Sequence, residues 1–536
     1  MDCTSSRLPY RQTGAFSKIA LDYIDQSAAL KPFFAHPPSL QGIQKAIAAR
    51  KQFASVQQNR QVLVQELKKQ YATTTTSEKV KANIEALFSA ETFTITTAHQ
   101  NNIFSGPLYF IYKIIHAIKL ADNLKALLPQ QNFVPVFYIG TEDADLEELD
   151  HIWVGGEKLV WETKQTGAVG RMKIDKQLTK LIGQMEGQLL VMPDGADIIS
   201  RLRKYYTEGT TVQEATFQFV NDLFAEYGLI VLLPDNAALK KQMLSLFKDD
   251  LLHQTASGIV EKTAEKLETA GYKVQANPRE INLFYLKDDK RERIEKDNGE
   301  WKAVNGEERF SETEMLNELE QHPDRFSPNV ILRGLYQETI LPNIAFIGGG
   351  GETAYWLQLK DLFEHYAVPF PVLVLRNSFL IVEKKWQAMI AKLGFTTSDF
   401  FLPEQELLNK LVARETDKKL KLNGTLSETE QLYSSIKKQA VSIDVTLEKH
   451  VEALKTQTLH RLQELEKKML RAEKRKFTDQ QRQIHTIKQQ LFPANGLQER
   501  RENISYYFAK WGAGFIDKLY QDSLGLEQEF VVIAEK

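Results

Sequence analysis

The chain has 536 residues, too long for one ordinary core, so two to four domains are expected. A composition of 43% hydrophobic and 26% charged residues is typical of an ordinary soluble protein with an ample core. A formal net charge of −2 gives no reason to expect a nucleic-acid or membrane partner. The single cysteine, Cys3, is expected in an N-terminal tail and excludes an intrachain disulfide, and no run of about 18 apolar residues occurs. These features predict a cytoplasmic protein.

Residues 1–90 are predicted to be mainly helical, with one long polar helix from Gln44 to Tyr71. A β-rich run from Phe93 to Ala98 follows and enters a polar turn, residues 99–102. Ser105-Gly106-Pro107 is expected to open a helix, with the serine as its cap.

That helix and a second apolar run, residues 134–139, complete a strand–helix–strand unit. Polar side chains crowd both strand ends, at 99–102 and at 142–145. Ligands of open α/β sheets bind beyond the carboxyl ends of the strands, so a binding site is predicted there.

The alternation of strands and helices is interrupted twice and then resumes. Short apolar strands are predicted near residues 228–235, 343–348 and 371–376. The fold class is therefore α/β, with a Rossmann-like parallel sheet interrupted by two inserted modules and followed by a C-terminal coiled coil. The predicted boundaries are 1–90 for a helical segment packing on the core, 91–160, 224–245 and 329–390 for the core, 161–223 and 246–328 for the modules, and 391–536 for the last domain.

The last domain has a distinct composition. Residues 426–491 contain no Gly or Pro, and Leu447, Val451 and Leu454 follow heptad spacing, which favours a coiled coil, parallel or antiparallel. An aromatic tail follows, in which Asn503, Tyr506, Tyr507 and Trp511 either stack on an adenine or form a small aromatic core.

The acidic residues Glu142, Asp143 and Asp145 can hold Mg²⁺, receive an amine or act as a general base. The alternative is that Asp143 caps a helix starting near Leu146. His99 is a candidate general acid/base or phosphate ligand, although a single histidine is usually structural. No His/Cys spacing indicates zinc, so no metal ligands are assigned.

The glycine run 348–351 either forms a plain tight turn or lets backbone N–H groups approach a phosphate. Arg333 and Arg376 suit capture of a carboxylate or phosphate, and an interdomain ion pair is the alternative. Gln337 and Glu338 lie on the same segment as Arg333.

Several collinear motifs resemble the bacillithiol-biosynthesis cysteine ligases, the BshC family. They are Ser105-Gly-Pro-Leu-Tyr-Phe-Ile-Tyr-Lys113, Pro135-Val-Phe-Tyr-Ile-Gly-Thr-Glu142-Asp143-Ala-Asp145, Asn282-Leu-Phe-Tyr285, Ile294-Glu-Lys-Asp-Asn-Gly299, Gln337-Glu338, Gly351-Glu352 with Tyr355-Trp356, and Asn503-Ile-Ser-Tyr506-Tyr507. The resemblance covers nearly the whole chain. One departure is Ala144, where the family usually has a histidine between two aspartates, so no catalytic role of that histidine carries over.

The resemblance implies a ligase that adds cysteine to the amine of glucosaminyl-malate, with ATP or ADP as nucleotide, Mg²⁺ as a possible ion, and a homodimer formed through the coiled coil. The alternative is a nucleotide-binding coiled-coil dimer with a scaffold or regulatory role. Candidate catalytic residues are Glu142, Asp143, Asp145 and His99, and Asn503, Tyr506, Tyr507 and Trp511 are candidates for the nucleotide. Candidate substrate-binding residues are Gln100, Asn101, Ser105, Gly106, Lys113, Arg333, Gln337, Glu338, Gly350, Gly351, Glu352, Tyr355 and Arg376.

Overall fold

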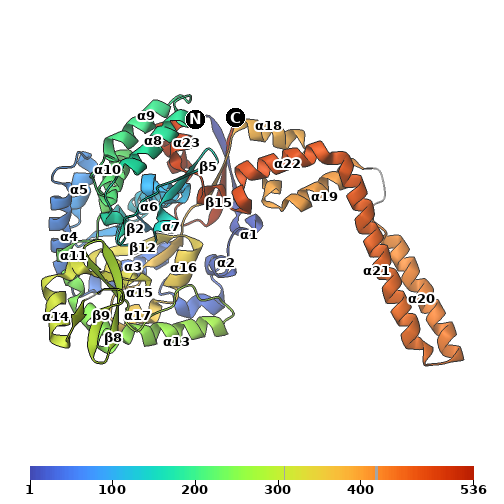
Figure 1. Cartoon of the computed structure of the whole chain (residues 1–536), viewed down its shortest axis with the longest axis horizontal. Helices are drawn as coiled ribbons and strands as arrows, with labels where there is room; N and C mark the ends of the chain where they lie inside the picture. Colours follow the sequence, from blue (N-terminus) through green and yellow to red (C-terminus); the bar gives the residue numbers. More distant parts are fainter. Residues whose placement is uncertain (307, 417–420) are drawn as a thin grey trace. The chain divides into compact units, whose positions relative to one another are not determined.

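The computed structural model describes residues 1–306, 308–416 and 421–536. The chain divides into two compact units, residues 1–381 with 497–536, and residues 382–496. The first unit holds the parallel sheet and the two modules inserted into it, and the second consists of helices (Figure 1).

The larger unit is built on five parallel strands in the order β13-β12-β2-β3-β6. In chain order they are β2 (Thr92–Gln100), β3 (Asn132–Gly140), β6 (Ile230–Leu232), β12 (Asn343–Gly348) and β13 (Val372–Leu375). The strand order reverses between β2 and β12, where the carboxyl ends of neighbouring strands leave a crevice for a ligand. The predicted Rossmann-like sheet with five strands is confirmed.

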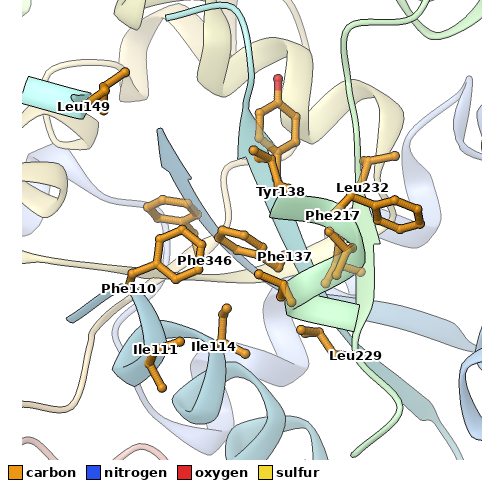
Figure 2. Packing of buried hydrophobic residues seen from close by; sticks show 14 of the residues in the cluster. Phe110, Ile111, Ile114, Phe137, Tyr138, Leu149, Phe217, Leu229, Leu232 and Phe346 are labelled. Atoms are coloured by element: carbon orange, nitrogen blue, oxygen red, sulfur yellow. The ribbon is translucent and has the colours of Figure 1, made fainter. Parts of the chain in front are cut away.

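Helix α6 (Leu108–Leu127) crosses from β2 to β3 and packs on both. Its Phe110 meets Phe137 of β3 edge-on, with ring centroids 4.8 Å apart, and Ile111 and Ile114 lie beside them (Figure 2). Along β12, Phe346 packs on Trp356, whereas Ala345 and Ile347 join a cluster with α3 (Leu40–Gln52). Successive side chains of β12 therefore pack into two different hydrophobic clusters, because side chains alternate between the two faces of a strand.

Ser105 does not cap α6, contrary to the sequence-based prediction. Ser105 and Gly106 both have positive φ, at 67° and 61°, and Pro107 is the first residue before the helix. The amide of Asn503 holds this turn instead, donating to the backbone oxygens of Phe104 and Gly106. A tertiary contact from a residue 397 to 399 positions away in sequence thus takes the place of the local cap.

Two modules interrupt the sheet. Between β3 and β6 lie α7 (Leu146–Leu149), the hairpin of β4 (His151–Val154) and β5 (Glu157–Val160), α8 (Lys176–Leu189), α9 (Gly195–Tyr205) and α10 (Val212–Phe224). Between β6 and β12 lie α11 (Ala237–Lys240), α12 (Leu244–His253), α13 (Thr255–Thr269), β7 (Leu283–Lys287), β8 (Lys290–Asp297), β9 (Glu300–Ala303), β10 (Arg309–Phe310), α14 (Glu312–Gln321), β11 (Phe326–Pro328) and α15 (Val330–Ile340). The strands of the second module form an antiparallel sheet in the order β10-β9-β8-β7-β11.

The N-terminal segment differs from its prediction in two respects. Cys3 is not in a tail, because β1 (Cys3–Pro9) pairs antiparallel with β15 (Glu529–Glu535), and β14 (Phe379–Val382) completes this sheet. The predicted single helix from Gln44 to Tyr71 is two helices, α3 and α4 (Val56–Tyr71). They separate because α3 packs on β12 and α4 packs on α15.

The smaller unit contains α18 (Lys384–Lys392), α19 (Glu404–Glu415), α20 (Asn423–Ile443), α21 (Leu447–Lys474) and α22 (Thr478–Leu491). Three residues join α20 to α21, and the two helices run antiparallel side by side (Figure 1). The Tyr433 hydroxyl lies 2.8 Å from the Thr458 hydroxyl across this pair. The C-terminal coiled coil is therefore present as a hairpin within one chain.

The contacts place residues 497–536 with the larger unit, whereas the predicted boundary put them with the coiled coil. The reason is the pairing of β15 with β1, together with α23 (Ile504–Trp511) and α24 (Ala513–Asp522), which pack on α9 and α6. Residues 382–390 likewise group with the smaller unit.

His116 of α6 is fully buried, and from its environment we predict that acid lowers the stability of the fold. Its Nδ1 accepts from the Asn377 backbone at 3.0 Å, and its Nε2 lies 2.7 Å from the Gly525 oxygen, an arrangement that needs the neutral ring. Burial lowers the pKa of His116 from 6.5 to about 4. Between these values the unfolded chain binds more protons than the folded one, so the histidine destabilises the fold as pH falls below about 6.5.

We expect His116→Gln to reduce the acid dependence of unfolding free energy by up to about 1.4 kcal/mol per pH unit below pH 6.5. Urea unfolding at several pH values measures this slope. His253→Gln, at the exposed end of α12, is the matched control and should keep the wild-type slope. An unchanged slope in His116→Gln would contradict the assignment.

Candidate functional site

A cavity of about 530 Å³ opens at the carboxyl ends of β2, β3 and β12, where the strand order reverses. Its walls come from the sheet, from α6 and α15, from the turn after β12, and from the second module. The lining residues are Ala98, His99, Gln100, Tyr109, Lys113, Tyr138, Gly140, Asp143, Phe284, Arg291, Asn329, Val330, Arg333, Gly349, Gly350, Gly351, Glu352, Tyr355, Arg376 and Arg500.

Asp143 follows β3 and lines the cavity beside two of the candidate substrate-binding residues, Gln100 and Arg333. The Gln100 amide donates to its Oδ2 at 2.9 Å, and Arg333 Nη2 lies 3.7 Å from the same oxygen. Its Oδ1 accepts from the Asp145 backbone at 3.3 Å. This hydrogen bond closes a local turn, and Asp143 is not the cap of helix α7. Although burial favours the neutral acid, Arg333 and Gln100 hold the pKa of Asp143 below its ordinary value. The side chain is therefore a carboxylate at neutral pH.

Lys113 links α6 to the glycine turn. Its ammonium donates to the Ala98 oxygen at 2.9 Å and pairs with Glu352, whose carboxylate also accepts from the Gly349 backbone at 2.8 Å. Burial lowers the pKa of Lys113, and the Glu352 charge opposes that shift. The glycine run is thus tied to α6 through one ion pair.

His99, the penultimate residue of β2, also lines the cavity. Its Nδ1 accepts from the Gln100 backbone at 2.9 Å, so the neutral ring carries its proton on Nε2, which is buried without a partner among the described residues. Burial, with the positive charges of Lys113 and Arg376, holds the pKa of His99 well below its ordinary value. An acidic form of His99 is therefore disfavoured at neutral pH.

Arg376, after β13, is a paired cation. Its Nη2 donates to Glu499 at 2.7 Å and its Nη1 donates to the Ser378 hydroxyl at 3.1 Å. Its guanidinium carbon also lies 5.1 Å from the Tyr109 ring centroid. Arg500, one residue after Glu499, is exposed at the cavity.

The second module contributes residues that the sequence did not single out, above all Arg291 of β8. Its Nε donates to the Ser327 hydroxyl at 3.1 Å, and its guanidinium carbon lies 3.7 Å from the Phe284 ring centroid. Asn329, the cap of α15, also lines the cavity. Phe284 belongs to the quoted Asn282–Tyr285 motif, which was the available signal that this module reaches the site.

Seven of the catalytic and substrate-binding candidates lie outside the cavity lining. Gln337 and Glu338 are buried in α15, where Glu338 pairs with Arg50 at 2.7 Å. Asn101, Ser105 and Gly106 belong to the buried turn that Asn503 holds, and Asp145 is exposed. Glu142 points away from the cavity into an ionic network.

That network joins the core to both modules. Lys240 is fully buried and lies 2.5 Å from Glu142 and 3.1 Å from Asp235, and it donates to the Asp324 oxygen at 3.1 Å. Arg171 of the first module donates twice to Asp235, at 2.6 and 2.8 Å. Two cations and two carboxylates are balanced here, which gives Glu142 a structural environment.

The aromatic tail forms a packed cluster. The Tyr507 ring stacks between Trp511 and Phe515, with centroids at 5.6 and 5.2 Å. Asn503 is fully buried, and its amide and carbonyl atoms are bonded to the turn before α6 and to the Ser505 backbone. Tyr506 and Trp511 are partly exposed.

Residues 1–306, 308–416 and 421–536 contain neither a metal-binding cluster of side chains nor a helix that could span a membrane. No group of three or more His, Cys, Asp or Glu side chains in these ranges is placed to hold a metal ion. No helix in the same ranges is long and apolar enough to cross a bilayer.

The fold and the site define a parallel α/β protein with a cationic cavity at the reversal of strand order. Residues 1–377 match the family model described as "Bacillithiol biosynthesis BshC, N-terminal Rossmann-like domain", and residues 379–535 match its C-terminal coiled-coil domain. The chain therefore belongs to the BshC family of bacillithiol biosynthesis.

Curated relatives span the same length. Proteins from Flavobacterium psychrophilum and Flavobacterium johnsoniae are each 38% identical, over 533 and 532 residues, and cover 99% of both chains. One from Cytophaga hutchinsonii is 38% identical over 506 residues, 94% of each chain. All three carry the name "Putative cysteine ligase BshC".

We expect Lys240→Met to destabilise the larger unit by about 3–5 kcal/mol, because two buried carboxylates would keep only Arg171 as a partner. Urea unfolding followed by tryptophan fluorescence measures the change. The matched control is Lys241→Met at the exposed neighbouring position, expected within about 0.5 kcal/mol of wild type. Equal stability of the two variants would show that the network contributes little.

Proposed function

We propose that this protein is a ligase that joins the carboxyl group of cysteine to the amine of glucosaminyl-malate, the last step of bacillithiol synthesis. Membership of the BshC family and the ligase names of its relatives support this reading. The observation that carries it is the charge of the cavity. Lys113, Arg291, Arg333, Arg376 and Arg500 line it, against the two carboxylates of Asp143 and Glu352.

Such a cavity suits a substrate with several carboxylates. Cysteine and the malyl group each bring carboxylates, and guanidinium groups bind carboxylates through paired hydrogen bonds. Lys113 and Arg376 already have carboxylate partners, at Glu352 and Glu499. The charge available to a ligand therefore comes chiefly from Arg291 and Arg500, and in part from Arg333, which lies 3.7 Å from Asp143.

Asp143 is the group proposed to receive the substrate amine. It is an ionised acceptor at the cavity wall, held by Gln100 and Arg333. Its lowered pKa makes it a weak proton acceptor, so its role is to attract and orient the amine next to the acyl carbon. Glu142 has no part in this proposal, because it is paired with Lys240 away from the cavity.

A carboxylate does not react with an amine until it is activated. When bound, ATP would supply the phosphoryl or adenylyl group for this step, and exposed Arg500 is the side chain placed to meet its phosphates. Mg²⁺ would need oxygens from those phosphates besides protein carboxylates. For an adenine ring in the tail, Tyr506 and Trp511 have exposed surface, whereas Asn503 and Tyr507 are committed to packing.

The alternative function, a nucleotide-binding coiled-coil dimer without ligase activity, rests on the helical hairpin. Leu432, Ile443, Val445 and Leu465 of this hairpin region are 58%, 83%, 68% and 48% exposed. Such side chains suit a second helical surface, and a homodimer through this unit is part of both proposals.

The decisive assay incubates the protein with cysteine, glucosaminyl-malate and ATP and detects the ligated thiol by mass spectrometry. We expect product with the wild-type chain, and at least a tenfold lower rate with Asp143→Asn, which keeps the shape and loses the charge. Glu147→Gln, an exposed change on the adjacent helix α7, should retain the wild-type rate. Absence of product together with stabilisation by nucleotide alone would favour the scaffold alternative.

A further inference from the structure

One cationic side chain of the cavity has no carboxylate partner among the described residues. The charges of the other four cations are balanced by a carboxylate or by solvent. Lys113, Arg376 and Arg333 lie within 4 Å of a carboxylate, and Arg500 is exposed to solvent. Arg291 is partly buried, and within the described residues no carboxylate lies within ion-pair distance of it.

The position of Arg291 is fixed by the second module. Phe284 of β7 and Ser327 of β11 are register partners on neighbouring strands, and Arg291 crosses them. Its guanidinium stacks on the Phe284 ring, and Ser327 accepts its Nε hydrogen. Both Nη atoms are left without a hydrogen-bond partner among the described residues, so a rigid pair of donors is available at the cavity wall.

Arg333 is held at a fixed position relative to Arg291. The Asn329 side chain accepts from the Ile331 backbone at 2.8 Å to cap α15, and Arg333 follows one turn later. The same side chain donates to Asn282, just before β7, at 2.9 Å. Asn282 is in turn anchored by its backbone N–H to buried Asp250 at 2.6 Å. The two arginines therefore stand on elements that are clamped together.

The local charge is unbalanced by one. Arg291 and Arg333 are positive, and Asp143 is the facing carboxylate, 3.7 Å from Arg333. Burial, followed by the charge of Arg333, lowers the pKa of Arg291 to about 10, so the guanidinium remains charged at neutral pH. A buried charge without a partner costs stability, and one bound carboxylate would restore neutrality.

We propose that Arg291 and Arg333 form a carboxylate subsite, through which the second module recognises the malyl group of the amine substrate. This inference rests on the proposed function for the identity of the ligand, and on the geometry alone for the site. Arg291 supplies the paired donors, and Arg333 shares its charge between the ligand and Asp143. The other source of an oxyanion is a nucleotide phosphate, whose higher negative charge would be repelled by Asp143.

Isothermal titration with L-malate, inorganic phosphate and ADP tests the subsite without requiring ligation. We expect malate binding to weaken at least tenfold in Arg291→Met, and to weaken less in Arg291→Lys, which keeps the charge and loses the fork. Binding of phosphate and ADP should be unchanged. The matched control is Arg293→Met, on the same strand, where an exposed guanidinium lies 3.4 Å from Glu295, and it should bind malate as wild type does.

A merely structural role of Arg291 predicts a different pattern. If the side chain held the fold together, Arg291→Met would melt at a lower temperature, whereas removal of an unpaired charge should leave the melting temperature equal or higher. Wild-type affinity for malate in Arg291→Met, no malate binding by the wild-type chain, or loss of phosphate binding instead would each overturn the proposal. Malate binding without ligation would overturn the proposed function and leave the subsite standing.

Discussion

The buried ammonium of Lys240 is the contact on which the position of the site depends. It bonds to Glu142 after β3, to Asp235 after β6 and to the backbone oxygen of Asp324 in the second module. Asp235 in turn binds Arg171 of the first module. Because breaking a buried ion pair is costly, these four side chains keep both modules against one edge of the sheet. The cavity walls follow from that arrangement.

A second group of long-range contacts fixes the opposite side of the crevice. Arg376 after β13 is held by Glu499, and Asn503 holds the turn that starts α6. Residues 497–536 thus return to the core and shape the cavity, although the smaller unit lies between them and the sheet in sequence. The cavity is lined by segments that are spread along the chain between Ala98 and Arg500.

The sequence predicted the sheet well, because each strand is a short apolar run between turn residues, and this signal is local. Asp143, Gln100, Lys113 and Arg333 were also predictable, since they follow strand ends or lie on the adjoining helices. Glu142 looked equivalent to Asp143, and only the fold shows that its neighbour is Lys240, 98 residues away. The pairing of β1 with β15 and the cavity position of Arg291 depend on contacts between distant segments, for which a single sequence carries no periodic signal.

A crystal structure of the protein with glucosaminyl-malate bound tests the position of the site most directly. The sugar is expected at the carboxyl ends of β2, β3 and β12, with its amine next to Asp143 and its malyl group between the arginines of β8 and α15. Density for the ligand elsewhere, with this cavity empty, would contradict the claim that the strand-order reversal is the site of ligation.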